Sequence, residues 1–382
     1  MVKSAYKEIM KFRVSQEDLA KALSASSRSA NARSNLPILA NILINCSKNN
    51  LEVTSTNLET AIKVKIPCKV EKEGKTTLPG RTLFEFVPQL PEGEITVEKL
   101  GEEVLLSTKG YSARLATMAA DEFPAIPKIA SGKELKIGAR DFAKNVQKVE
   151  YCASQDESRP ALTGILCELE KKGFLMVATD GYRLSFSQIG DTKSGQTFKL
   201  IIPARALSEL AKIIAETESA EGEQLAILVA NQLNQVEFKI GSIEFTTRTI
   251  EGEYPGWQKI IPSAFATKAK IQKADFVKQL RIASIFARDA GNIVKLNLAQ
   301  GQLTIFANTS QVGSNEIKTE AQIDGPGGEI AFNFRYLLEA LSAIEGEDVL
   351  FEMGESLTPA RLKSTEPKDP SFHIIMPVRL QS

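Results

Sequence analysis

The sequence predicts an α+β protein of three similar domains, each with two helices packed on antiparallel sheets. Three observations predict this fold. A β-hairpin pattern occurs three times, a short helical segment follows each hairpin, and the 382 residues accommodate three copies of the pattern. A repeat of about 125 residues has the length of a domain and is too long for a solenoid unit.

Each hairpin begins with a strand in which apolar and polar residues alternate, as in a half-buried strand. These first strands are Ala40–Ser47, Gly164–Glu170 and Ile293–Ala299, and a short polar turn follows each of them. The second strands begin at Leu51, Phe174 and Leu303. We interpret their polar ends, Asn57, Asp180 and Asn308, as corresponding positions of three hairpins.

Helices are predicted at matching places in the three copies. Short segments with i, i+3, i+4 apolar periodicity start near Arg81, Arg205 and Arg335. Longer amphipathic helices are expected around Leu19–Ala25, Phe142–Val149 and Phe276–Ile285. With linkers after Glu122-Phe-Pro124 and Glu253-Tyr-Pro255, the predicted domains are 10–131, 132–262 and 263–382, preceded by an extension, 1–9.

Composition excludes several classes of function. The longest apolar run, Leu225–Ala230, is far shorter than the ~20 residues of a membrane span, and Met1–Lys11 lacks the apolar stretch of a signal peptide. The only histidine is His373, and the cysteines Cys46, Cys68, Cys152 and Cys167 form no CxxC motif. We therefore expect a cytoplasmic protein with reduced cysteines and no metal, cofactor or membrane association, and the common catalytic motifs are missing.

The charge balance argues against a broad basic face, because 47 Lys and Arg residues stand against 47 Asp and Glu. The long helical segments 15–33, 139–159 and 272–289 nevertheless hold eleven basic and eight acidic residues. One interpretation is ordinary solvated helix faces. The other is a weak positive field that tolerates a polyanion without gripping it.

Several sequence strings resemble bacterial DNA polymerase III beta subunits, the sliding clamps. They are Leu36-Pro-Ile-Leu39, Leu51–Glu59, Val177-Ala-Thr-Asp-Gly-Tyr-Arg-Leu184, Glu253-Tyr-Pro255 and Ile374–Leu380, and the match runs in register from Met10 to Leu380. The resemblance implies the DNA clamp fold and a head-to-tail homodimer that closes into a ring around duplex DNA without sequence specificity. It also implies a non-catalytic, nucleoid-associated factor that tethers the replicative polymerase alpha subunit and docks the clamp loader and other clamp-motif proteins.

A size estimate favours the dimer independently. A domain of ~125 residues has a diameter of about 35 Å, so three in a triangle leave a gap of about 5 Å and six in a hexagon leave about 35 Å. Only the second passes a duplex roughly 20 Å wide.

Carried over by position, the resemblance implies a partner-peptide pocket between the second and third domains. Its predicted residues are Leu162, Thr179, Gly181, Tyr182, Arg183, Leu184, Pro255, Lys259, Ile260, Asn333, Tyr336, Leu357, Pro359, Ile374, Met376, Pro377, Val378 and Arg379. Tyr182 and Lys259 replace a His and an Arg of the enterobacterial pattern. For the apolar members, the alternative is ordinary domain core.

The predicted DNA-binding residues are Arg33, which matches a family arginine that touches DNA, and Lys148, Arg159, Arg205 and Arg281. Pro160-Ala161 stands where some members have paired aromatics after the arginine that matches Arg159, so the DNA contact there stays open.

Two other functions remain as alternatives. One is a ring or scaffold that binds partner peptides without DNA. The other is a hydrolase built on paired carboxylates such as Asp156 and Asp180. The counterparts of Asp180 in the repeat, Asn57 and Asn308, fit a turn position better than acid chemistry.

Overall fold

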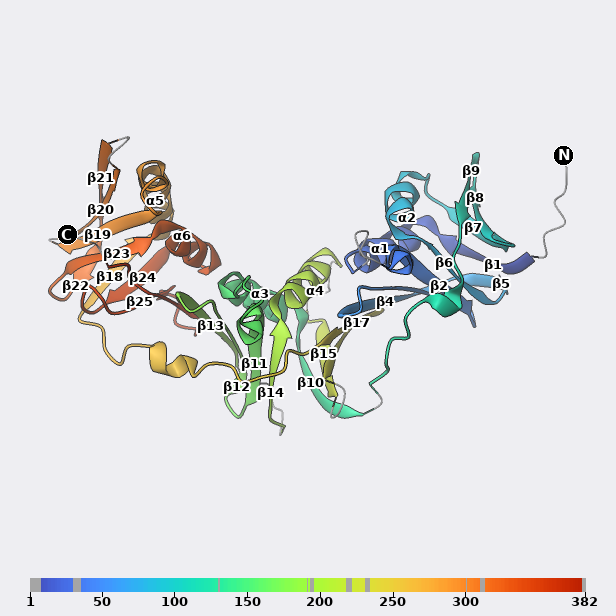
Figure 1. Cartoon of the computed structure of the whole chain (residues 1–382), viewed down its shortest axis with the longest axis horizontal. Coiled ribbons are helices and arrows are strands. Elements are labelled where there is room, and N and C mark those ends of the chain that lie inside the picture. Colours follow the sequence, from blue (N-terminus) through green and yellow to red (C-terminus); the bar gives the residue numbers. More distant parts are fainter. Residues whose placement is uncertain are drawn as a thin grey trace. The chain divides into compact units, whose positions relative to one another are not determined.

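The computed structural model describes residues 8–29, 36–129, 131–190, 192, 196–217, 222–230, 234–299, 301–309 and 313–379 (Figure 1). Its contacts divide the chain into two compact units. The first unit is Met1–Arg140 with Lys212–Thr249, and the second is Asp141–Ala211 with Ile250–Ser382. Each unit holds two sheets, in which the neighbouring strands pair antiparallel.

The first unit contains a five-stranded and an eight-stranded sheet. The five-stranded order is β5 (Lys69–Lys72), β1 (Glu8–Ser15), β7 (Glu94–Leu100), β8 (Glu103–Thr108) and β9 (Tyr111–Ala116). The eight-stranded order is β10 (Gly132–Gly138), β15 (Gln224–Ala230), β16 (Gln235–Ile240), β17 (Ile243–Arg248), β4 (Thr60–Pro67), β3 (Asn50–Thr56), β2 (Asn41–Ser47) and β6 (Gly74–Pro79).

The second unit contains a nine-stranded and a four-stranded sheet. The nine-stranded order is β14 (Phe198–Pro203), β11 (Gly164–Glu170), β12 (Gly173–Thr179), β13 (Arg183–Ile189), β26 (Phe372–Ile375), β25 (Ala360–Ser364), β24 (Asp348–Met353), β18 (Thr267–Gln272) and β22 (Gln322–Asp324). The four-stranded order is β21 (Gly313–Glu320), β20 (Gln302–Thr309), β19 (Ile293–Ala299) and β23 (Gly328–Asn333).

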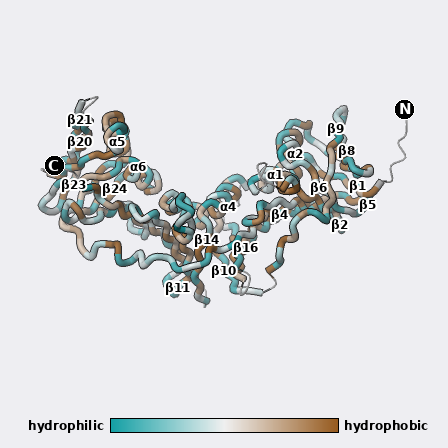
Figure 2. Tube along the Cα trace, in the orientation of Figure 1, coloured by the Kyte–Doolittle hydropathy of each residue, from teal (hydrophilic) through white to brown (hydrophobic). Residues whose placement is uncertain are grey.

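The prediction of two helices per domain is confirmed. The first helices are α1 (Gln16–Ser27), α3 (Ala139–Val149) and α5 (Lys273–Ala287), and the second are α2 (Gly80–Phe86), α4 (Ala204–Glu216) and α6 (Phe334–Ala343). The helices bury one stripe against a sheet; in α5 it is Phe276, Leu280, Ala283 and Ala287. Figure 2 accordingly shows hydrophobic and hydrophilic residues interspersed along the elements instead of gathered in long blocks.

The three domains close in the same way. A residue that follows the last strand of each domain pairs with the edge strand that precedes the second helix. Met118 bridges to Thr77, the Ile250 N–H donates to the Ile201 carbonyl (2.7 Å), and the Val378 N–H donates to the Ala331 carbonyl (2.8 Å). Thr77, Ile201 and Ala331 each lie three residues before the start of the next helix, so one closure recurs in three copies.

Sheets also continue from one domain to the next within each unit. In the first unit β17 pairs with β4 and places Phe245 opposite Ile62; in the second, β26 pairs with β13 and places His373 opposite Ser185. By their positions in the hairpins, Phe245 corresponds to His373 and Ile62 to Ser185, so both junctions share one register. In the first domain β9 has the position that β17 and β26 have in the others, and in the third domain β21 has the position of β4 and β13. Both β9 and β21 lie at the edge of their sheets.

The hairpin registers correct one proposed correspondence. Ser47 pairs with Asn50, Glu170 with Gly173 and Ala299 with Gln302, so the hairpins align Asn57 with Asp180 and with Thr309. The prediction of Asn308 was wrong by one residue because the third hairpin repeats at a slightly longer interval. At the N-terminus, β1 begins at Glu8, two residues before Met10, and residues 1–7 lie outside the described part of the chain.

All four cysteines are buried and unpaired. Burial raises the pKa of Cys68 to about 11 and that of Cys152 to about 12, and it raises the pKa of Cys46 and Cys167 as well. Their thiols therefore behave as small apolar side chains, as expected from their apolar strand contexts. Among the described residues, no helix is long and apolar enough to cross a membrane.

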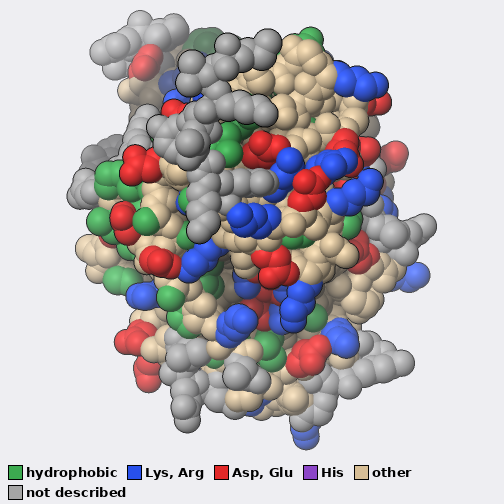
Figure 3. All heavy atoms as spheres, turned by 90° about the vertical axis from the view of Figure 1, so that its right-hand side faces the viewer, with side chains coloured by type: hydrophobic (Ala, Val, Ile, Leu, Met, Phe, Trp, Pro, Cys, Tyr) green, Lys and Arg blue, Asp and Glu red, His purple; other side chains and the backbone are tan. Residues whose placement is uncertain are grey.

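Charged side chains of both signs pair across the five-stranded sheet. Lys11 Nζ lies 2.7 Å from a Glu98 carboxylate oxygen, and Arg13 and Lys69 both reach Glu94 at 3.4 Å. Figure 3 views the molecule from this side and shows Lys and Arg side chains interspersed with Asp and Glu. The described residues of this face therefore form no extended patch of one sign in this view.

Candidate functional site

A candidate docking surface lies in the second unit, where three neighbouring strands end. Ile375 of β26 pairs with Arg183 of β13 on one side and with Ala360 of β25 on the other. One residue further along each strand come Met376, Tyr182 and Pro359, and the Met376 N–H donates to the Tyr182 carbonyl (2.9 Å). The register thus brings together residues that are far apart in the sequence.

Exposed apolar side chains mark this surface. Tyr182 is 62% exposed, Leu357 57% and Met376 36%. Few large apolar side chains are this exposed in the described chain, and exposed apolar groups near one another favour contact with a partner. The surface formed by Tyr182, Leu357, Pro359 and Met376 is called the strand-end surface below.

A buried apolar cluster supports the strand-end surface from below. Leu184 and Ile374 are each 1% exposed and pack with Trp257, while Ile260 lies at the margin of the cluster. The Phe186 ring stacks on Phe372 at 4.8 Å and lies 5.4 Å from Trp257. The aromatic contacts fix the two strands relative to each other, so the exposed residues are presented on a rigid base.

The turn that carries Tyr182 is fixed by side chain to backbone hydrogen bonds. The Asp180 carboxylate accepts from the backbone N–H groups of Tyr182 (2.9 Å) and Arg183 (3.0 Å). Asn57 accepts from Glu59 (3.0 Å) and Thr60 (2.7 Å) in the same way. Asp180 is therefore a turn residue, as its repeat position predicted, and its carboxylate is occupied by the backbone.

Arg183 does not offer its guanidinium to solvent, since its side chain is only 11% exposed. Its Nε donates to Asp180 (3.1 Å), its Nη2 donates to the Tyr151 carbonyl (2.8 Å), and its Nη1 pairs with Glu339. The guanidinium also lies over the Tyr336 ring, 4.5 Å from its centroid. Arg183 therefore ties the turn to α6, and little of its side chain reaches solvent.

The other predicted pocket residues differ in what they can contact. Leu162 and Thr179 are buried, with Thr179 Oγ1 donating to the Arg183 carbonyl (2.6 Å) and accepting from the Gly181 N–H (3.1 Å). Asn333 caps α6 by accepting from the Arg335 N–H (3.0 Å). Pro255, Lys259 and Arg379 are exposed, and Ile260, Tyr336, Pro377 and Val378 are half-buried. The buried members thus shape the surface, and the exposed ones are available to a partner.

A network that sequence analysis missed lies behind this surface. His373 Nδ1 is 2.8 Å from both the Tyr151 and the Ser185 hydroxyls, and burial lowers the pKa of His373 to about 3. A lone histidine in an apolar strand gives no signal for these partners, because each lies about two hundred positions away in the sequence.

The corresponding junction in the first unit has the same backbone but different side chains. The Arg248 N–H donates to the Glu59 carbonyl (3.0 Å), as the Met376 N–H does to Tyr182. Glu59 and Arg248 thus stand where the second unit has Tyr182 and Met376. Charged groups thus stand where the second junction has Tyr182 and Met376, so this exposed apolar pair has no counterpart at the two positions of the first junction.

The predicted DNA-binding residues differ in availability. Arg205 and Arg281 are exposed on α4 and α5, and Arg159 is exposed with its Nε 3.2 Å from Asp156. Arg33 lies outside the described residues. Lys148 instead makes an ion pair of 2.9 Å with Asp369, and both side chains are only 12% exposed. The ammonium is committed to Asp369, which argues against the DNA contact predicted for Lys148.

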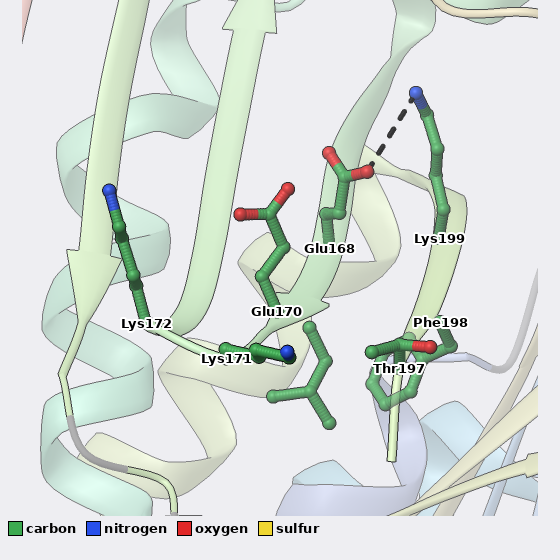
Figure 4. Close-up of a pocket in the computed structure, with 8 residues that line it drawn as sticks. Glu168, Glu170, Lys171, Lys172, Thr197, Phe198 and Lys199 are labelled. Carbon is green, nitrogen blue, oxygen red and sulfur yellow. Dashed lines mark ion pairs between the residues drawn. The ribbon is translucent and has the colours of Figure 1, made fainter. Parts of the chain in front are cut away.

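A separate hollow of about 550 Å³ lies at β14 and the β11–β12 turn (Figure 4). Glu168, Glu170, Lys171, Lys172, Thr197 and Lys199 line it, and Glu168 lies 3.9 Å from Lys199. None of the predicted site residues that the structure describes lines it.

Three domains of one topology, joined edge to edge through shared sheets, define a three-domain clamp fold. Models of the N-terminal, central and C-terminal domains of the DNA polymerase III beta subunit match residues 10–127, 136–256 and 258–379. The chain therefore belongs to the DNA polymerase III beta subunit family.

Relatives with known names agree over their full length. The beta sliding clamp of Staphylococcus epidermidis is 28% identical, and that of Synechocystis sp. is 30% identical; each match covers 97% of this chain and 100% of the relative. The crystal structure of the DNA polymerase sliding clamp from Bacillus subtilis is 25% identical, covers 98% of this chain and 100% of that chain, and superposes with a TM-score of 0.91.

Proposed function

We propose that the chain is a non-catalytic sliding clamp that closes as a head-to-tail homodimer around duplex DNA and tethers the replicative polymerase. One observation carries the proposal: the β17–β4 and β26–β13 pairings have the same register. The strands at the equivalent positions of the first and third domains, β9 and β21, are edge strands and could pair in that register too. A third junction of the same kind joins β9 of one copy to β21 of another, and two such contacts close a ring.

The internal junctions predict the register of this third one. Ala113 corresponds to Phe245 and Asn315 to Ile62, so Ala113 faces Asn315 of the second copy and Tyr111 faces Ile317. Tyr111 is 55% exposed, and the Asn315 Oδ1 is buried with no hydrogen-bond partner in the described part of the chain. Pairing covers both edges, which would otherwise invite uncontrolled association.

Sedimentation velocity tests the assembly. The wild type should sediment as a dimer at micromolar concentration. Ala113→Asp should raise the dissociation constant at least about tenfold, because it places a charge in the centre of the pairing. Ala125→Asp, at an exposed position outside β9 and β21, is the matched control. A monomeric wild type, or equal effects of the two substitutions, would contradict the proposal.

Holding DNA by encirclement requires few contacts. The chain has a net charge of zero, so its binding to phosphates should be weak at physiological salt, and the exposed Arg205 and Arg281 are the proposed contacts. Clamp loaded on nicked circular DNA should survive high salt and should be lost when the DNA is linearised. Gel filtration of labelled protein measures this, and equal retention on both forms would favour surface binding. A scaffold that works without DNA would load on neither.

We further propose that the strand-end surface binds the clamp-motif peptides of the polymerase alpha subunit, the clamp loader and other partners in the cytoplasm, at the nucleoid. Its exposed Tyr182, Leu357 and Met376 suit the Leu and Phe side chains of a peptide such as Gln-Leu-x-Leu-Phe. Met376→Asp should weaken that peptide by more than about 1 kcal/mol in calorimetric titration. Arg248→Asp, at the corresponding position of the first junction, should leave binding unchanged. Loss with both variants, or with neither, would place the site elsewhere.

A further inference from the structure

The first unit contains a groove of about 600 Å³ that no part of the proposed function uses. Residues of α1, β4, the end of α4 and the β16–β17 turn line it. Its volume falls within the range of ligand sites, and none of the predicted site residues that the structure describes lines it.

The floor of the groove is aliphatic. Its apolar members, each at most 8% exposed, are Ala22, Ala25, Val64, Ile66, Ile213, Ile240 and Ile243. Among the described residues that line the groove, none is aromatic. Such a floor accepts a branched aliphatic side chain, because the contact removes apolar surface of both partners from water.

The rim of the groove is acidic. Glu17, Asp18, Glu216 and Glu223 line it together with one ammonium, that of Lys21. Lys21 pairs with Glu17 at 2.8 Å, and Arg28 pairs with Glu216. Among the described residues, Asp18 and Glu223 have no ion pair, so two carboxylates face the groove without a cation.

Two further features add to this negative field. The Glu223 Oε1 lies 3.2 Å from the position a Cβ would take at Gly241, which places the carboxylate over the β16–β17 turn beside Ile240. The end of α4, at Ile213, Glu216 and Thr217, also lines the groove, and a helix C-terminus carries partial negative charge. An aliphatic floor within an acidic rim complements a cation attached to an aliphatic body.

We propose that this groove docks a short basic segment of a partner protein in which lysine or arginine flanks leucine-type side chains. The ammonium or guanidinium groups pair with Asp18 and Glu223, and the leucine side chain covers the isoleucine floor. The proposal goes beyond the clamp function, since a peptide of this charge differs from the uncharged Gln-Leu-x-Leu-Phe type.

Calorimetric titration of the full-length protein with the peptide Ac-Lys-Leu-Leu-Lys-Leu-NH₂ tests the proposal. The double variant Asp18→Asn/Glu223→Gln should weaken binding at least about tenfold, because it removes two charge-assisted contacts. Ser24→Trp, which fills the half-buried groove wall from α1, should also abolish binding. Glu92→Gln/Glu157→Gln removes the same charge from exposed positions outside the groove and is the matched control.

Two comparisons separate the groove from general charge effects. Spermidine, which has ammonium groups but no branched aliphatic side chain, should bind at least about tenfold more weakly than the peptide. The peptide Gln-Leu-x-Leu-Phe should not compete. Equal losses in the groove and control variants, equal affinity for spermidine, competition by Gln-Leu-x-Leu-Phe, or no binding would each overturn the proposal. None of these results depends on whether the chain encircles DNA.

Discussion

Replacing Lys148 by Met should destabilise the second unit. The Lys148 and Asp369 side chains are each 12% exposed and lie 2.9 Å apart, so the substitution leaves a buried carboxylate without its cation. Breaking a buried ion pair from one side costs about 3–5 kcal/mol. Asp369 keeps hydrogen bonds from the Ser371 N–H (3.0 Å) and Oγ (2.6 Å), so we expect the lower end, about 3 kcal/mol.

Urea unfolding followed by tryptophan fluorescence measures this loss. Trp257 is the only tryptophan and lies in the buried cluster of the second unit, so its emission reports on that unit. Lys144→Met changes an exposed lysine of the same helix and is the matched control. Adding Asp369→Asn to Lys148→Met should recover part of the stability, because it removes the unpaired charge. If Lys148→Met and Lys144→Met have the same free energy of unfolding but Lys148→Met loads poorly on DNA, the ion pair adds no stability and Lys148 contacts DNA.

The same pair predicts an acid dependence with a definite sign. Burial raises the pKa of Asp369, but hydrogen bonds from Ser371 and Lys148 outweigh it and hold the pKa below its usual 3.8. The pair therefore contributes stability above pH 3.8, and this contribution is lost as pH falls through the lower folded-state pKa. Lys148→Met should remove part of that dependence.

Three further predictions concern buried groups. Burial lowers the pKa of His373 from 6.5 to about 3, so between these pH values only the unfolded chain binds the proton. The free energy of unfolding should therefore decrease by up to about 1.4 kcal/mol for each unit by which the pH falls. Urea titrations at pH 7, 6 and 5 should give a flatter pH dependence for His373→Gln, and an unchanged slope would contradict the burial. The four cysteines should react with Ellman's reagent only after unfolding, and rapid labelling of the native protein would disagree with their burial. Gly173→Ala should lower the free energy of unfolding by more than about 2 kcal/mol, because Gly173 has a φ of +127° and a Cβ there would lie 2.2 Å from the Ile189 carbonyl oxygen. Gly190→Ala, where a Cβ would meet open space, is the control and should leave thermal unfolding nearly unchanged.

The sequence predicted the structures that depend on contacts between residues close together in the chain. Alternation and helical periodicity locate the hairpins and helices, because a strand and a helix bury residues at different spacings. The Asp180 turn was predictable for the same reason, since its hydrogen bonds go to residues two and three positions away. The strand-end surface was predicted only through family resemblance, because the register that brings Met376 to Tyr182 depends on pairing between distant strands.

Long-range pairing also explains why the sequence does not reveal the Lys148–Asp369 ion pair. In the sequence it is a lysine on an amphipathic helix, which is typical of a solvated face. Its partner Asp369 lies 221 positions away, and no periodicity points to such a contact. The shared register of the two junctions was equally inaccessible, because Phe245 with Ile62 and His373 with Ser185 share no chemistry.

The shared register has a consequence for which domain the polypeptide of the proposed ring can begin with. If every junction around the ring is the same backbone pairing, the place where one chain ends and the next begins is set by covalent linkage alone. A circularly permuted gene that starts near residue 132 and rejoins the original termini through a flexible linker should rebuild the same ring. Its subunit boundary would then fall at the β17–β4 pairing instead of at β9 and β21, and the β9–β21 pairing would become internal to a single polypeptide.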